Sequence, residues 1–184
     1  MFFSNELQNI ISGTGYVTKG AAIQAIANHI GKSKAAGKST EEKELVKKQE
    51  AATIIAYSRY NKFFYEHIVE ERFLTAGAEQ KVYLSDDNIH VIKINDAIFY
   101  ATWSDYFTSL LLHNYFFPAT AYELIGFHIK NTVLYAVVKQ PYVQSSSLTN
   151  ENAVKELMLS NGFVHTRGSD YFHPAMGIIL ERPA

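Results

Sequence analysis

The sequence has no cysteine, almost no net charge and no long apolar run, and each absence excludes a class of protein. Without cysteine the chain forms neither disulfides nor thiolate metal sites, which fits a reducing cytoplasm. A formal net charge of -1 gives no overall attraction to nucleic acid or to an anionic membrane. No apolar run approaches the roughly 20 residues that span a bilayer, and the N-terminus lacks a basic segment followed by an apolar one. We therefore expect neither a membrane span nor a secretory signal.

Apolar and aromatic residues, in contrast, are plentiful. Of the 184 residues 47% are hydrophobic, and 12 Tyr, 12 Phe and one Trp are available for a core. This length suffices for one compact domain, or for one small domain with a helical appendage. Near Gly77 helix-like patterns give way to strand-like ones. We predict an α+β protein, with a helical N-terminal region over residues 1–72 and an α+β domain over residues 73–184.

Three helices are predicted in the N-terminal region. Apolar spacing favours two short helices within roughly the first 30 residues. Ser39 and Glu42 have the spacing of a capping box, so a long helix begins near Thr40 and runs to about Leu74, unless it breaks near Asn61. The side chains expected on the buried side of this helix are Leu45, Ala52, Ile55, Tyr60 and Phe63.

Two basic stretches suggest phosphate or nucleic-acid binding. The first, Gly31–Thr40, has five residues between its glycines, where a phosphate loop has four, and it follows a predicted helix rather than a strand. We interpret its basic part, Lys32–Lys38, as a solvated linker. The second, Tyr57–Phe64, interleaves basic and aromatic residues, as sites for single-stranded nucleic acid do. Because the chain has no basic excess, we interpret this stretch as an amphipathic helix and expect no nucleic-acid partner.

A hairpin with an embedded lysine opens the second half of the chain. Its strands are expected over residues 82–85 and 90–94, on either side of an Asp-Asp-Asn turn. Successive side chains of a strand point to opposite faces. Lys93 should therefore share a face with Val91, and Ile92 should point to the other face.

The elements after this hairpin complete the α+β pattern. An aromatic helix is predicted over residues 99–117, and a second hairpin over residues 121–129 and 133–138. A further helix follows to about residue 160, with short strands after it. The seven histidines show no metal-ligand spacing, so no metal site is predicted.

Five sequence blocks stand in a characteristic order in this half. They are Gly77–Tyr83, Val91–Asp96, Leu112–Pro118, Tyr122–Phe127 and Val137–Pro141. A glycine turn, a Val-Ile-Lys strand, a helix and a second hairpin in this order resemble the N-terminal lobe of a protein kinase. More closely, the chain is similar over roughly Phe73–Leu180 to the kinase-like domain of polyvalent proteins, which are multidomain proteins of phages and conjugative elements.

The resemblance implies a nucleotide site. The glycine turn would cover the phosphates of ATP, and Lys93 would pair with the α- and β-phosphates. Gln140 and Tyr142 would lie at the connection to a second lobe, beside the adenine. The cofactors implied are ATP and Mg²⁺, and the residues implied to bind the nucleotide are Gly77, Glu79, Gln80, Val82, Lys93, Gln140 and Tyr142.

Three departures from the kinase pattern lead us to predict no catalytic residues. The turn holds one glycine, Gly77, where ordinary kinases have several. Between Lys93 and the second hairpin only Asp96 and Asp105 are acidic, so no glutamate that would orient the lysine is identifiable. After Leu180 no segment supplies a catalytic carboxylate or Mg²⁺ ligands, so we expect no phosphate transfer by this chain.

Three hypotheses for function remain open. The first is a non-catalytic kinase-like module, a cytoplasmic pseudokinase of bacterial mobile-element origin. It would bind a protein partner or a second copy of itself and retain a weak nucleotide site. The second is an ATP-dependent protein kinase that another chain or a dimer mate completes. The third is a nucleic-acid-binding accessory protein that uses residues 57–64 and the basic linker at 32–38.

Overall fold

The chain forms two compact units in the computed structural model. One unit contains residues 9–142, and the other contains residues 1–8 together with 143–184. The residues that the structure describes are 2–31, 39–144, 150–168 and 170–180. The predicted basic linker, Lys32–Lys38, lies outside them.

Three helices precede the sheet, as the sequence predicts. Helix α1 spans Phe2–Ile11, α2 spans Ala21–Ile30 and α3 spans Thr40–Tyr60. The Ser39 side chain accepts a hydrogen bond from the Glu42 N–H, and the Glu42 carboxylate accepts one from the Ser39 N–H. The predicted capping box at the start of α3 is therefore confirmed.

The buried side of α3 differs from the predicted one. The helix ends at Tyr60, at the break expected near Asn61. Leu45 is 58% exposed, Tyr60 is 89% exposed and Ala52 is exposed as well, so the prediction that these three residues are buried is wrong. The side chains of α3 that are buried are Glu50, Ile54 and Ser58. Because two of these three are polar, the apolar periodicity of the sequence does not reveal this side of the helix.

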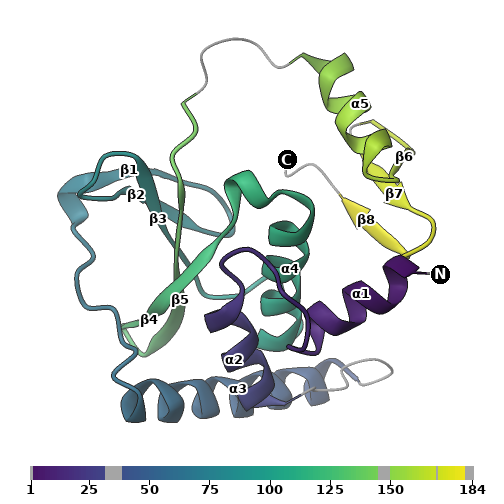
Figure 1. The fold of residues 1–184 in the computed structure, drawn as a ribbon. Helices are drawn as coiled ribbons and strands as arrows, with labels where there is room; N and C mark the ends of the chain where they lie inside the picture. Colours follow the sequence, from purple (N-terminus) through teal and green to yellow (C-terminus); the bar gives the residue numbers. More distant parts are fainter. Residues whose placement is uncertain (1, 32–38, 145–149, 169, 181–184) are drawn as a thin grey trace. The chain divides into compact units, whose positions relative to one another are not determined.

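Five antiparallel strands form the main sheet, in the order β1-β2-β3-β5-β4 (Figure 1). Their bounds are Phe73–Ala76 for β1, Lys81–Leu84 for β2, His90–Asn95 for β3, Glu123–Lys130 for β4 and Val133–Pro141 for β5. Two short 3-10 helices, Glu70–Arg72 and Pro118–Thr120, lie before β1 and β4. Both predicted hairpins are confirmed.

The register of the sheet divides its side chains between two faces. Residues directly opposite each other in an antiparallel pair share a face. Lys93 lies opposite Val82 of β2 and Val138 of β5, whereas Ile92 lies opposite Lys139. The predicted alternation, with Lys93 and Ile92 on different faces, is confirmed.

Helix α4, Trp103–Phe116, packs on the face that carries Lys93 and Val138. It begins later than the predicted start at residue 99. The cause is Thr102, whose side-chain oxygen accepts a hydrogen bond from the Asp105 N–H at 3.0 Å and so caps the helix.

Helix α3 holds the segment that leads into α4. The Glu50 carboxylate, 3% exposed, accepts hydrogen bonds from the Trp103 N–H at 2.7 Å and from Ser104 Oγ at 3.0 Å. Lys47 Nζ donates to the carbonyl oxygen of Ala97 at 2.5 Å. The start of α4 is therefore fixed by side chains that lie about 50 residues earlier in the chain.

The main core lies between the helices and this face of the sheet. Helices α2 and α3 pack against α4, and α2 also contacts β4. Trp103 and Phe107 of α4 meet Phe127 of β4 edge to face, with ring centroids 6.3 and 6.2 Å apart. Since α2 and α3 belong to the same compact unit as the sheet, the predicted boundary between residues 72 and 73 does not divide compact units. The domain assignment itself stays a prediction.

The second unit contains a helix and a small sheet. Helix α5 spans Glu151–Ser160, and the Asn150 side chain caps it by accepting a hydrogen bond from the Ala153 N–H. An antiparallel sheet consists of β6, Val164–His165, β7, Tyr171–His173, and β8, Ile178–Leu180. Within the described ranges of the whole chain, no helix has the length and apolar character that a bilayer crossing requires.

Candidate functional site

Lys93 lies in the central strand of the main sheet, on the face that α4 covers. Val82 and Val138 are its cross-strand neighbours on that face. Val91 and Gln140 pair with each other two residues farther along the same strands, and they share this face as well. Three residues predicted to bind nucleotide, Val82, Lys93 and Gln140, are therefore brought together on one surface.

The predicted phosphate-covering residues Gly77, Glu79 and Gln80 form the turn between β1 and β2. The Gly77 N–H closes the turn by donating to the Gln80 carbonyl oxygen at 3.0 Å. Gly77 is exposed, and a Cβ atom added there would meet no other atom within 4 Å. The surrounding fold therefore does not itself require glycine at this position.

The Glu79 carboxylate acts on the α4 face of the sheet although its own residue is exposed. Burial raises the pKa of Tyr106 and of Tyr122, and the negative charge of Glu79 contributes to the rise in both. This contribution of Glu79 is the smallest of the causes that act on either hydroxyl. It does not place Glu79 beside Lys93, because the pKa of Lys93 is lowered by burial alone.

The end of β5 is fixed by hydrogen bonds. Gln140 is 8% exposed, and its Nε2 donates to the Thr120 carbonyl oxygen at 2.7 Å. Tyr142 continues the pairing beyond β5, because its N–H donates to the Ile89 carbonyl oxygen at 2.9 Å. These contacts place Gln140 on the Lys93 face. The roles of Gln140 and Tyr142 beside an adenine stay predictions.

No acidic side chain forms a salt bridge with Lys93 in the part of the chain that the structure describes. Lys93 is half-buried, and burial lowers the pKa of its ammonium. The two acids that the sequence offers nearby are engaged or remote. Asp96 accepts a hydrogen bond from the Ile98 N–H at 3.0 Å, and Asp105 is exposed in the first turn of α4. Among the described residues, no carboxylate thus neutralises the charge of Lys93.

An aromatic ring lies beside this ammonium instead. Lys93 Nζ is 5.3 Å from the centroid of the Tyr122 ring, which is a cation–π distance. The His113 ring of α4 lies against the same tyrosine, with centroids 4.6 Å apart, and its Nε2 is 3.1 Å from the Thr120 carbonyl oxygen. Burial lowers the pKa of His113, the hydrogen bond with Thr120 opposes this in part, and the charge of Lys93 lowers the pKa further. The imidazole is therefore neutral near pH 7.

Sequence patterns alone do not predict Tyr122, His113 or Asn114 as residues of this site. Their contacts join the end of α4 to the start of β4, and helical or strand periodicity carries no information about such contacts. All three belong to the blocks Leu112–Pro118 and Tyr122–Phe127, which carry the kinase resemblance. Their position in these blocks is the feature of the sequence that could have identified them.

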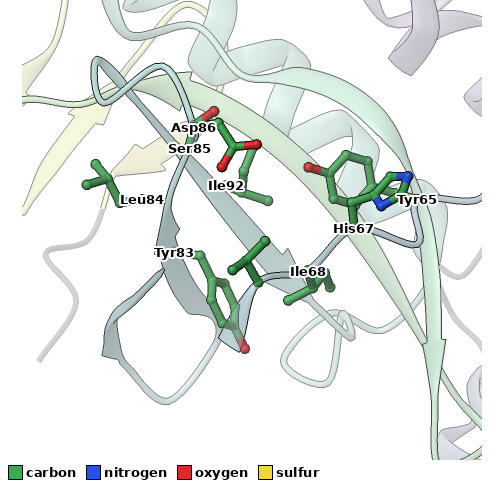
Figure 2. Close-up of a pocket in the computed structure, with 9 residues that line it drawn as sticks. Tyr65, His67, Ile68, Tyr83, Leu84, Ser85, Asp86 and Ile92 are labelled. Atoms are coloured by element: carbon green, nitrogen blue, oxygen red, sulfur yellow. The ribbon is translucent and has the colours of Figure 1, made fainter. Parts of the chain in front are cut away.

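A separate hollow lies on the opposite face of the sheet. Its volume is about 290 Å³, including space open to solvent. Figure 2 shows that the side chains of Tyr65, His67 and Ile68 border it together with those of β2 and β3. Tyr83 and Ile92, which line it, are cross-strand partners on the face away from Lys93. None of the residues predicted to bind nucleotide lines this hollow, so it is distinct from the Lys93 site.

The described residues give little support to a metal site or to a nucleic-acid site. Within them, no group of three or more histidine and acidic side chains is placed to hold a metal ion. In the basic and aromatic stretch, Tyr57, Phe63 and Phe64 pack against the core, whereas Tyr60 is exposed. This arrangement agrees with inward-facing aromatics rather than with a continuous stacking surface for bases.

A family model described as a serine/threonine/tyrosine kinase found in polyvalent proteins matches residues 47–182, which is most of the chain. The matched region contains Lys93 and all the site residues described above. It begins within α3, and so includes Lys47 and Glu50, which hold the start of α4. No match was found among curated proteins or among solved structures.

Proposed function

Since the chain belongs to the family of serine/threonine/tyrosine kinases found in polyvalent proteins, we propose that it is a non-catalytic kinase-like module. It acts by binding another protein and retains a weak nucleotide site around Lys93. One observation carries this proposal. The Lys93 ammonium lies on the α4 face of the sheet without a carboxylate partner among the described residues.

A partly desolvated cation without a counter-ion favours an anionic ligand. Coulomb attraction is stronger in a site of low dielectric than in water, and phosphate oxygens accept charge-assisted hydrogen bonds from an ammonium group. Val82, the half-buried cross-strand neighbour of Lys93, supplies apolar surface for a purine base. The open space around Gly77 allows a phosphate to approach the backbone of the turn.

The same surroundings support a non-catalytic role. Kinase activity depends on an ion pair between the strand lysine and a glutamate of the neighbouring helix. Helix α4 places a neutral imidazole, His113, near Lys93, and its one first-turn acid, Asp105, is exposed. We expect an affinity for ATP in the range of about 1 mM, which corresponds to about -4 kcal/mol.

Exposed apolar side chains support a role in protein binding. In the unit of residues 1–8 and 143–184, Val154 is 37% exposed, Leu157 is 50% exposed and Ile179 is 61% exposed. In the other unit Ile98 and Phe99, which precede α4, are 64% and 62% exposed. Apolar side chains that are neighbours on the surface are typical of interaction sites. Val154 and Leu157 lie one turn apart on α5, and Ile98 and Phe99 are adjacent in the chain, so each pair offers apolar surface to a protein partner or to a second copy of the chain.

Thermal unfolding with and without about 5 mM ATP and Mg²⁺ tests the nucleotide site. A ligand that binds only the native state stabilises it by about 1 kcal/mol when its concentration is about five times Kd. For a chain of this size the expected rise in Tm is about 2–4 °C. Lys93→Met should abolish the rise, and Lys139→Met, a matched strand lysine on the opposite face, should retain it. No rise in the wild-type protein would refute nucleotide binding.

A transfer assay with labelled ATP tests the non-catalytic part of the proposal. We expect no phosphate transfer to the chain itself or to a general protein substrate. Transfer that Lys93→Met abolishes would favour an ATP-dependent kinase completed by a second copy or another chain. Light scattering of the same samples measures self-association, and salt-sensitive binding to DNA would favour a nucleic-acid role instead.

A further inference from the structure

We infer that Tyr122 is a positioning residue, whose ring holds the Lys93 ammonium in position. The importance of this contact for ligand binding rests on the proposed function, because it requires Lys93 to be the phosphate ligand. The contact itself does not depend on that function, and it can be measured without any nucleotide.

The contact has the geometry of a cation–π interaction. Lys93 Nζ is 5.3 Å from the Tyr122 ring centroid, and such contacts extend to about 6 Å. The negative face of an aromatic ring attracts an ammonium group, and this attraction strengthens when water is excluded. Lys93 is half-buried and Tyr122 is half-buried beside it, so water screens the pair only partly.

The backbone of Tyr122 is fixed by one buried side chain. The Tyr122 N–H donates to Asn114 Oδ1 at 2.7 Å, and Asn114 Nδ2 donates to the Tyr122 carbonyl oxygen at 2.7 Å. Asn114 is 1% exposed, and its Nδ2 also donates to the Thr18 carbonyl oxygen at 3.0 Å. A single asparagine of α4 thus sets the position of Tyr122 just before β4 begins.

The ring of Tyr122 is fixed as well. Its hydroxyl forms a hydrogen bond with the Gln140 side chain, and Gln140 is held in turn by the Thr120 carbonyl oxygen. The His113 ring lies 4.6 Å away, centroid to centroid, at an angle of 51°. Contacts with α4, with β5 and with the segment before β4 therefore hold the ring next to Lys93 before any ligand arrives, as a pre-organised site requires.

A ring and a carboxylate differ in what they leave for a ligand. A carboxylate orients a lysine but cancels its charge, whereas a neutral ring orients the lysine and leaves the full positive charge in place. His113 is neutral near pH 7, so it adds no second positive charge beside Lys93. The site therefore presents an oriented and uncompensated cation, which suits a polyphosphate.

The direct test is proton NMR of the Lys93 side chain without nucleotide. A methylene group held near the face of an aromatic ring has resonances displaced upfield, and comparison with Lys93→Met identifies those of Lys93. We expect the displacement in the wild-type protein and in Tyr122→Phe, which keeps the ring, and its loss in Tyr122→Leu. An undisplaced Lys93 in the wild type, or a displacement that persists in Tyr122→Leu, would overturn the inference.

The second test measures ATP affinity in the same variants by calorimetry. We expect Tyr122→Leu to weaken binding by about 3- to 10-fold, as the loss of a partly desolvated cation–π contact predicts, and Tyr122→Phe to stay within about 2-fold. Tyr135→Leu is the matched control, because Tyr135 is also half-buried but packs on the opposite face of the sheet. Equal weakening in Tyr122→Leu and Tyr135→Leu would indicate a general loss of structure and overturn the positioning role.

The two tests separate this inference from the proposed function. If the wild-type protein shows the upfield displacement but binds no ATP, the contact stands and the nucleotide proposal fails. If ATP binds and depends on Lys93 but no displacement is seen, the nucleotide proposal stands and Tyr122 is not the positioning residue. If Tyr122→Leu does not fold, the wild-type displacement and its retention in Tyr122→Phe still decide the matter.

Discussion

Two lysines of neighbouring strands, Lys93 and Lys139, meet opposite electrostatic surroundings on the two faces of one sheet. Lys139 Nζ lies 2.8 Å from Asp87 Oδ2, and hydrogen bonds from Lys139 and His90 hold the pKa of the Asp87 carboxyl well below its usual range. Lys93 has a tyrosine ring beside it and no carboxylate partner in the described residues. Both lysines are strand residues with part of the side chain covered, so neither burial nor strand position distinguishes them. The neighbouring charges distinguish them, because a carboxylate lies beside Lys139 and a neutral ring lies beside Lys93. Lys93 is therefore the lysine that is available to an anion.

The two faces also differ in how their polar groups are held. On the α4 face, Glu50 and Asn114 are almost fully buried, and their hydrogen bonds fix α4 and Tyr122. On the opposite face, Lys130 and Glu70 form an ion pair at 2.6 Å with both side chains about half exposed. Exposed pairs of this kind contribute little to stability. We therefore expect substitutions on the α4 face to have the larger effects.

The largest effect should come from Glu50→Ala. The substitution leaves the Trp103 N–H without its hydrogen-bond acceptor and removes the bond from Ser104 Oγ. The unsatisfied buried N–H and the loss of two hydrogen bonds to a charged acceptor together cost about 3 kcal/mol of unfolding free energy. Urea unfolding measures this cost. Glu44→Ala, at an exposed position of the same helix, should change the unfolding free energy by less than about 0.5 kcal/mol. Equal effects of the two substitutions would contradict the account of α3.

Asn114→Ala should have the next largest effect. It removes the side-chain partner of both the N–H and the carbonyl group of Tyr122, so we expect a loss of about 2–3 kcal/mol in urea unfolding. The exposed Asn152 of α5 serves as the control, and Asn152→Ala should be nearly neutral. A neutral Asn114→Ala would show that Tyr122 is not held from α4.

His113→Glu would make Lys93 resemble Lys139. The new carboxylate would lie close enough to Lys93 to neutralise part of its charge, since Lys93 already affects the pKa of His113. We expect ATP affinity to fall by about tenfold, which corresponds to about 1.4 kcal/mol. His113→Gln keeps the side chain polar and neutral, and calorimetry should find its affinity within about 2-fold of wild type. Tighter ATP binding by His113→Glu would show that the site needs an ion pair.

Asp87→Asn would make Lys139 resemble Lys93, and its effect should be the smallest. The pKa of Asp87 is lower in the folded chain than its ordinary value of 3.8, so its stabilising contribution is present above that value and is lost as the pH falls through the folded pKa. The Tm of the wild type should exceed that of Asp87→Asn near neutral pH, and the difference should shrink as the pH falls below about 4. A difference that grows on acidification would contradict this assignment.

The local part of this structure could be predicted from the sequence. The capping box at Ser39 and Glu42 involves residues three apart, and strand alternation fixed the relation of Lys93 to Ile92, so both follow from short-range geometry. The long-range part could not be predicted. Glu50 bonds to Trp103, 53 residues away, and a polar side chain on a helix looks the same in a sequence whether it faces water or a second helix.

The candidate site shows the same division. Family resemblance identified Lys93 and the turn at Gly77, because these belong to contiguous blocks. The ring beside Lys93 lies 29 residues later in the chain, at the position of Tyr122, and only the packing of α4 against the start of β4 brings it there. We looked in the sequence for an acidic partner of Lys93, and the partner in the structure is an aromatic ring, so that search missed it.

The most direct test of this account is calorimetric titration of ATP into the wild-type chain, Lys93→Met and Lys139→Met under the same conditions. The account predicts equal Kd values for the wild type and Lys139→Met, and a loss of at least about tenfold in Lys93→Met. The reason is that Asp87 neutralises Lys139, whereas Lys93 has an aromatic ring beside it and keeps its charge for phosphate. Equal losses in the two variants, or unchanged binding in Lys93→Met, would contradict the claim that Lys93 is the nucleotide-binding lysine.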